Sequence, residues 1–149
     1  MTQIGQDAFK YVKTLSSVYI PDSVSAIGGW AFFQNEALVS AYIPDSVTRI
    51  GACTYSGCGA LTSLRLSESL TSIENFSIEK CYSLSSVNVP DSVTRIGDGA
   101  FKGSSHIEVF DFGNTRSTIP QLANTNAFEN LNEGYKIVVP DALYENWSL

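Results

Sequence analysis

The sequence predicts a solenoid, a stack of similar short coils that each contain a strand, a turn, a short strand and a helical turn. Three observations predict it: a period of 23 residues, apolar alternation within each period, and turn-forming residues at the same places in each copy. One column of the repeat contains only isoleucines in 23-residue steps: Ile4, Ile27, Ile50, Ile73 and Ile96. Self-similarity at a fixed period of roughly 20 to 50 residues is the sequence signature of stacked repeats.

Further apolar columns keep the same step. One contains Leu15, Leu38, Leu61, Leu84 and Ile107. A second contains Ile20, Ile43, Leu66, Val89 and Phe112, and a third contains Val24, Val47, Leu70 and Val93. A fourth, mostly aromatic, contains Phe9, Phe32, Tyr55, Ile78 and Phe101. We expect all of these columns to point into a common apolar interior.

The main strand of each copy is illustrated by the segment LSSVYI, residues 15–20. Val18 and Ile20 alternate with Ser17 and Tyr19, which is typical of a strand with one buried face. Pro-Asp-Ser follows, and it favours a turn because Pro21 cannot donate a hydrogen bond to a strand ladder. The sequence therefore predicts a strand that ends in a turn.

A short strand and a helical turn complete the copy. The short strand is predicted at VSAIG, residues 24–28, where Gly28 is expected to supply a turn that needs permissive backbone angles. GWAFFQNEA, residues 29–37, predicts one or two helical turns with Phe32 pointing inward. One copy cannot bury its apolar side alone, but stacked copies can. Because parallel strands stack about 4.8 Å apart, five coils give a body on the order of 25 Å long.

The 23-residue step ends after the fifth copy. Residues 113–125 are rich in Thr and Asn and are predicted to be an irregular linker, followed by a terminal unit at residues 126–149. Ala127–Phe128 follow Ala100–Phe101 by 27 residues instead of 23, which indicates an insertion of four (27 − 23). We expect residues 1–149 to be one domain from a longer chain, either monomeric or associating end to end through uncapped termini.

Charge and hydropathy exclude several classes of protein. The formal net charge of −6 argues against binding to nucleic acid or to an anionic membrane surface. No apolar run approaches the roughly 20 residues of a membrane-spanning helix, and no signal peptide is visible. Three cysteines are an odd number, which is not typical of a disulfide-stapled secreted domain.

The residues with reactive side chains do not form a catalytic or metal-binding set. His106 is the only histidine, and no spacing places a nucleophile and an orienting acid beside it. The cysteines lack the paired CxxC spacing of a zinc site. We therefore expect no enzyme activity and no cofactor.

Two columns leave alternatives open. Cys58 and Cys81 lie 23 residues apart, so stacking would bring their Cα atoms to roughly 5 Å, within disulfide range. Buried free thiols in a column of small residues are the favoured interpretation. An acidic column at the turn contains Asp22, Asp45, Glu68 and Asp91. Each aspartate is expected to close its own turn, and calcium binding is the alternative.

The columns that remain on the main strand face solvent. One is uniform and contains Ser17, Ser40, Ser63, Ser86 and Val109; the other varies and contains Tyr19, Tyr42, Arg65, Asn88 and Asp111. Tyr and Arg are enriched at binding hot spots, so the variable column is a candidate protein-binding surface. The alternative is that strands favour Tyr and that exposed columns drift. On the short strands, Arg49 and Arg95 could hold an acidic group of a partner; the favoured alternatives are that they are solvated or pair with the aspartate column.

The repeated unit resembles the BspA-like, or Treponema pallidum type, leucine-rich repeat. LSSVNVPDSVTRIGDGAFKGSSHI, residues 84–107, carries the resemblance, which covers about residues 1–118 as repeats and extends to NAFENLNEGYKIVVPDALYENW, residues 126–147. The third and fourth copies depart from the pattern. Thr54–Tyr55 and Ser77–Ile78 replace Ala-Phe, Glu74 replaces a glycine, and LSES, residues 66–69, replaces IPDS.

This resemblance implies a β-rich α/β leucine-rich-repeat fold, a right-handed superhelix of about five coils with a C-terminal capping unit. It also implies a bacterial protein at the cell surface or secreted, which adheres to a host-matrix or other surface protein. The expected function is therefore non-enzymatic binding through the exposed strand face. The alternative is a spacer that presents other domains of a longer protein.

Overall fold

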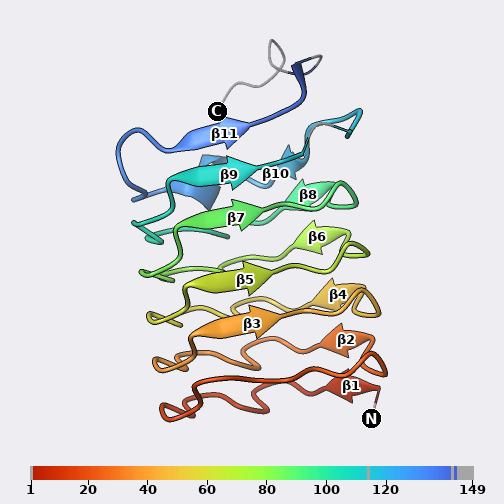
Figure 1. Cartoon of the computed structure of the whole chain (residues 1–149), viewed down its shortest axis with the longest axis vertical. Coiled ribbons are helices and arrows are strands. Elements are labelled where there is room, and N and C mark those ends of the chain that lie inside the picture. Colours follow the sequence, from red (N-terminus) through yellow and green to blue (C-terminus); the bar gives the residue numbers. More distant parts are fainter. Residues whose placement is uncertain (1, 114, 142, 144–149) are drawn as a thin grey trace.

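The computed structural model describes residues 2–113, 115–141 and 143. They form one stack of about six coils at a spacing of about 23 residues, with β1 (Gln3–Ile4) at one end and β11 (Lys136–Val138) at the other (Figure 1). The predicted solenoid is confirmed. The described part of the predicted terminal unit stacks on the fifth coil as a sixth, through pairing of β11 with β9 (Val109–Asp111); residues 142 and 144–149 of that unit lie outside the described residues.

The main strands run parallel to one another along the stack. They are β3 (Ser40–Tyr42), β5 (Ser63–Arg65), β7 (Ser86–Asn88), β9 (Val109–Asp111) and β11. Paired residues of these strands lie 23 residues apart, at equivalent positions of the repeat: Ser40 lies opposite Ser63, and Ser86 lies opposite Val109. In the first coil, the strand predicted at residues 15–20 is reduced to a bridge between Ser17 and Ser40.

The short strands form a second ladder, behind the main strands in Figure 1. They are β1, β2 (Ala26–Ile27), β4 (Arg49–Ile50), β6 (Ser72–Ile73), β8 (Arg95–Ile96) and β10 (Gln121–Leu122). Both ladders are interrupted at the same level, because β4 does not pair with β6 and β5 does not pair with β7. We call the two ladders, with the Pro-Asp-Ser turns that connect them, the strand side of the molecule.

The residues that lead from each short strand to the next main strand form the turn side, and here the predicted helical turns are wrong. The backbone makes consecutive tight turns, with left-handed dihedral angles at two positions of each coil. One position is occupied by Asp7, Trp30, Cys53, Phe76 and Gly99, and the other by Tyr11, Gln34, Gly57, Lys80 and Gly103. Amides here donate to carbonyls of the next coil, as Phe32 does to Thr54 at 2.9 Å. Within residues 2–113 and 115–140, the only helix is the 3₁₀ segment η1 (Thr125–Phe128).

The glycine column beside the short strands is required by close packing between coils. Gly28 was expected to supply permissive backbone angles, but its φ is not in the left-handed region. Instead, a Cβ atom on Gly28 would lie 2.5 Å from the amide nitrogen of Gln6 in the preceding coil, and one on Gly51 would lie 2.2 Å from that of Gly29. Glycine therefore lets neighbouring backbones approach each other.

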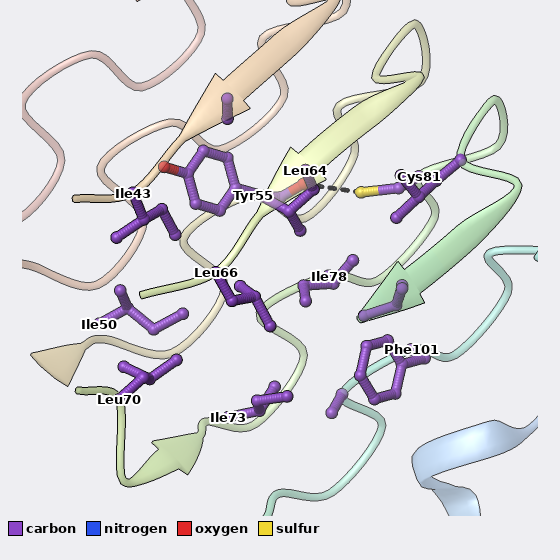
Figure 2. Packing of buried hydrophobic residues seen from close by; sticks show 14 of the residues in the cluster. Ile43, Ile50, Tyr55, Leu64, Leu66, Leu70, Ile73, Ile78, Cys81 and Phe101 are labelled. Atoms are coloured by element: carbon purple, nitrogen blue, oxygen red, sulfur yellow. Dashed lines mark hydrogen bonds between the residues drawn. The ribbon is translucent and has the colours of Figure 1, made fainter. Parts of the chain in front are cut away.

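The apolar columns line the interior as predicted, and most of their members are fully buried. Figure 2 shows the middle of this core, to which Ile43, Ile50, Leu66 and Tyr55 all belong. The aromatic column stacks face to face, with ring centroids 5.4 Å apart for Phe9 and Phe32 and 5.3 Å apart for Phe32 and Tyr55. Equivalent side chains thus repeat their contacts from coil to coil, which is how a short repeat obtains a continuous core.

The last coil departs from the regular step. The predicted irregular linker, residues 113–125, contains β10, whose Gln121 and Leu122 pair with Arg95 and Ile96 at a step of 26. Arg116 lies in this segment and is only 7% exposed. Its guanidinium donates to the carbonyl oxygens of Pro90 at 2.7 Å and Phe112 at 2.9 Å. These bonds give hydrogen-bond acceptors to the buried guanidinium and a donor to the carbonyl groups around it.

Candidate functional site

The variable column of the main strands lies on the surface, as its alternation with core residues predicts. Tyr19 is 85% exposed and Tyr42 is 54% exposed, and Asn88 and Asp111 are also exposed. In the parallel register, Tyr42 lies opposite Arg65 and Asn88 lies opposite Asp111. The structure therefore brings the candidate residues into one row across successive coils.

Arg65 is held in place by contacts within the molecule. Its guanidinium lies 4.7 Å from the ring centroid of Tyr42, 2.8 Å from Oδ1 of Asp45, and 3.0 Å from the carbonyl oxygen of Ile43. The hydrogen bond from Arg65, aided by one from the amide of Glu68, lowers the pKa of Asp45. The Arg65–Asp45 hydrogen bond in turn raises the pKa of Arg65. This cluster presents a fixed ring and a fixed cation to solvent.

The two arginines of the short strands have different surroundings. Arg95 lies 3.5 Å from Oε2 of Glu74, whose other carboxylate oxygen accepts a hydrogen bond from Ser72 at 2.6 Å. Arg49 is exposed and borders a shallow, open depression of about 290 Å³, which is also lined by Ile50, Gly51, Ala52 and Glu74. Arg95 thus pairs with the glutamate that replaces a glycine, not with the aspartate column.

The aspartate column links coils. Oδ1 of Asp45 accepts a hydrogen bond from the amide of Glu68, 23 residues further along, at 2.9 Å, so the expectation that each aspartate closes its own turn is wrong for Asp45. Asp91 accepts a hydrogen bond from the hydroxyl of Thr115 and lies 3.7 Å from Nε of Arg116. Within the described part of the chain, no three His, Cys, Asp or Glu side chains are grouped so as to hold a metal ion.

Cys58 and Cys81 are free and fully buried, so the alternative of a disulfide between them is not realised. The thiol of Cys58 lies 3.2 Å from the carbonyl oxygen of Phe32, and that of Cys81 lies 3.3 Å from that of Tyr55, the bond drawn in Figure 2. Burial raises the pKa of Cys58 to about 12 and that of Cys81 well above its ordinary value. Thiols in this state are inert as nucleophiles.

An aromatic group on the turn side was not identified from the sequence. The ammonium group of Lys10 lies 5.4 Å from the ring centroid of Tyr11, 5.8 Å from that of Trp30 and 5.6 Å from that of Phe33. Tyr11 and Trp30 occupy the left-handed positions, where later copies have Gly57, Gly103 and Gly99. The sequence did contain a signal for this group: aromatic residues stand in columns that hold glycine in later copies. A bulky residue is costly at left-handed angles, so its presence there calls for an explanation.

These observations define a class of protein: a parallel β-solenoid whose copies share their core residues and differ on their surface. The chain belongs to the BspA type leucine-rich repeat family, whose model matches residues 2–134 in 6 copies.

Solved structures of bacterial proteins share the fold. A leucine rich cell surface protein from Faecalibacterium prausnitzii is 30% identical with a TM-score of 0.74, over 83% of this chain and 32% of that one. The T. pallidum leucine rich repeat protein is 23% identical with a TM-score of 0.72, over 87% of this chain and 60% of that one. The pneumococcal vaccine antigen PcpA is 19% identical with a TM-score of 0.65, over 85% of this chain and 28% of that one.

The chain spans about a third of the length of the F. prausnitzii protein and less than two thirds of the T. pallidum protein. No curated protein matches this sequence. None of the helices in the described residues has the length and hydropathy needed to span a bilayer.

Proposed function

We propose that this chain is a non-enzymatic, protein-binding module of a bacterial surface protein, and that it binds its partner through the row Tyr19, Tyr42, Arg65, Asn88 and Asp111. The observation that carries this proposal is the exposure of Tyr42 in strand β3 and of Tyr19 at the equivalent position of the first coil. Large aromatic side chains left in water on rigid elements are suited to protein recognition, since they lose little conformational entropy on binding.

The arrangement around Arg65 supports the same proposal. Its guanidinium is fixed by Tyr42 and Asp45 before any partner arrives. Binding through a side chain that is already ordered avoids much of the entropy cost of immobilising it. Arg49, exposed at the open depression, adds a cation that a carboxylate of the partner would pair with.

The similar solved structures support a location at the cell surface, with adhesion as the role. One is called a cell surface protein and another a vaccine antigen. Repeat solenoids commonly bind through extended faces, but a fold alone does not determine function. The competing function is a spacer that presents other domains, which the partial coverage of the relatives' chains favours.

The test compares binding of the chain and its variants to a panel of purified host-matrix proteins by biolayer interferometry. We expect the double variant Tyr19→Ser, Tyr42→Ser to weaken binding to a panel member at least tenfold, with an unchanged thermal unfolding midpoint. Tyr82→Ser is the matched control, because Tyr82 is 48% exposed but lies outside the row. Equal binding by the double variant and the wild type would contradict the proposal, and absence of binding to any panel member would favour the spacer.

A further inference from the structure

Backbone hydrogen bonds between coils on the strand side recur in four columns. In each column a backbone amide donates to a carbonyl oxygen of a neighbouring coil. Examples from the first three coils are the bonds from Ile43 to Arg65, Thr48 to Ser25, Gly51 to Ile27, and Thr62 to Val39. At the junction of the third and fourth coils the corresponding donors are the amides of Leu66, Thr71, Glu74 and Ser85. None of these four makes such a bond within the described structure. The two sheets break at the same junction.

The turn side remains bonded across this junction. The amides of Cys53, Tyr55 and Gly57 donate to the carbonyl oxygens of Asn75, Ser77 and Glu79, at 3.0, 2.8 and 2.8 Å respectively. These lengths match those at the other junctions, for example 2.9 Å from Trp30 to Ala52. The third and fourth coils therefore keep their backbone bonds on the turn side and lose those of both ladders on the strand side. There, the chain crosses between the coils at residues 66–71, and the hydroxyl of Ser92 donates to the carbonyl oxygen of Leu70 at 2.7 Å.

The amino-acid sequence explains where the bonds are lost. Glu74 occupies the glycine column in which a Cβ atom on Gly51 would lie 2.2 Å from a backbone atom of the preceding coil. Because Glu74 carries a Cβ atom, the fourth coil cannot approach the third as closely there. In the turn of the third coil, Ser67 stands where Pro44 and Pro90 stand in its neighbours. The depression lined by Gly51 and Glu74 opens at this junction.

We infer that the solenoid has a built-in hinge between its third and fourth coils. The three bonds of the turn side form the pivot. The two ladders, which lack backbone bonds at this junction, change their spacing as far as the connecting turn and the Ser92–Leu70 hydrogen bond allow. Parts of a protein with few buried hydrogen bonds open at the lowest free-energy cost, so bending is concentrated here. The hinge does not depend on the proposed binding function.

The hinge would matter for binding if the proposed function is correct. It divides the candidate row, since Tyr42 and Arg65 lie on one side of it, and Asn88 and Asp111 on the other. A partner that contacts both parts would have to fix the hinge at one angle. A partner that contacts only the tyrosines and Arg65 would leave it free.

The experiment uses pairs of spin labels on the exposed serine column of the main strands. Labels at Ser40 and Ser86 lie two coils apart and span the junction, whereas labels at Ser17 and Ser63 lie two coils apart within the first three coils. Both separations are about 10 Å by strand stacking, where dipolar broadening of the EPR spectrum reports distance. Cys53→Ser removes the partly exposed thiol, and Cys58 and Cys81 are too buried to react.

We expect the Ser40–Ser86 pair to give a distance distribution at least twice as broad as the Ser17–Ser63 pair. Glu74→Gly should narrow the former to the width of the latter, because it restores the glycine of the other coils. Equal widths in the two pairs of the parent protein would overturn the hinge, whatever the variant does. A broad distribution that Glu74→Gly leaves unchanged would overturn the role given to Glu74.

Discussion

The turn side and the strand side of this solenoid are built from the same repeat, but they tolerate sequence change differently. On the turn side, positions with left-handed backbone accept residues as different as Trp30, Cys53 and Gly99, and the inter-coil bonds persist. On the strand side, one change from glycine to Glu74 coincides with the loss of backbone bonds in both ladders at one junction. The side chains at these left-handed positions are at least partly exposed, on a backbone held by its bonds, whereas strand-side backbones must nearly touch.

The largest loss of stability is therefore expected when a methyl group is added to a backbone on the strand side. Gly51→Ala places a Cβ atom 2.2 Å from the amide nitrogen of Gly29, and backbone cannot move as a flexible side chain can. We expect the free energy of unfolding to fall by about 3 kcal/mol, measured by urea denaturation. Gly5→Ala is the matched control, because Gly5 lies in the same column and its added methyl group would have no atom within 4 Å. A similar loss in both variants would contradict the role of inter-coil contact.

Arg116 provides a second, smaller test of the strand side. Its guanidinium donates to the Pro90 and Phe112 carbonyls at the junction where the 23-residue step is lost. Arg116→Leu would remove the guanidinium hydrogen bonds to both carbonyls, so we expect a loss of about 2 kcal/mol in the free energy of unfolding. Arg49→Leu, at an exposed site, should change it by less than about 0.5 kcal/mol. A neutral Arg116→Leu would mean that these carbonyls find other donors.

On the turn side, a substitution should stabilise the protein. Lys80 has a φ of 54°, while the same position holds glycine in the neighbouring copies, at Gly57 and Gly103. Lys80→Gly relieves this backbone strain, partly offset by the greater freedom of glycine in the unfolded chain. We expect a gain of about 0.5 kcal/mol, seen as a higher urea midpoint. In the same column, Gly103→Ala introduces a side chain at a left-handed position and should lower the midpoint. A loss of stability in Lys80→Gly would show that Lys80 is not strained.

The smallest expected effect concerns pH. The pKa of Asp45 is lowered from its ordinary value of 3.8, chiefly by the hydrogen bond from Arg65, so the stabilisation is present above that value and lost as pH falls through the lowered pKa. The difference in unfolding free energy between wild type and Asp45→Asn should therefore shrink on acidification. In an Arg65→Gln background this pH dependence should be weaker. An unchanged dependence there would assign the shift to the amide of Glu68 alone.

The period and the apolar columns were sufficient to predict the fold and the core, because the stacked coils bury the same positions in each copy. The turn side was not predictable in the same way. GWAFFQNEA has helical spacing, but hydrogen bonds to the next coil hold it in consecutive turns, and a single copy contains no information about those bonds. Gly28 was expected to serve backbone angles, yet its role is close approach to Gln6, which only the packed structure shows.

The candidate row was predictable as an exposed column, because strand alternation determines which side chains face outward. The contacts of Arg65 were not, since they join Tyr42 and Asp45, which lie 23 and 20 residues before it. Arg116 lay beyond the regular period, where no column could place it. The break between the third and fourth coils had a visible signal in Glu74, but its extent depended on how the two backbones met.

The buried thiols have a consequence for where the protein can work. Cys58 and Cys81 bond to backbone carbonyls, as the hydroxyl of Ser104 does to that of Ile78 at 2.6 Å in the next copy. In these three copies the position holds a small donor, and sulfur and oxygen both serve. Because no covalent bridge joins these coils, their stacking does not depend on an oxidant. The same coils would hold together in a reducing anaerobic environment and in an oxygenated one.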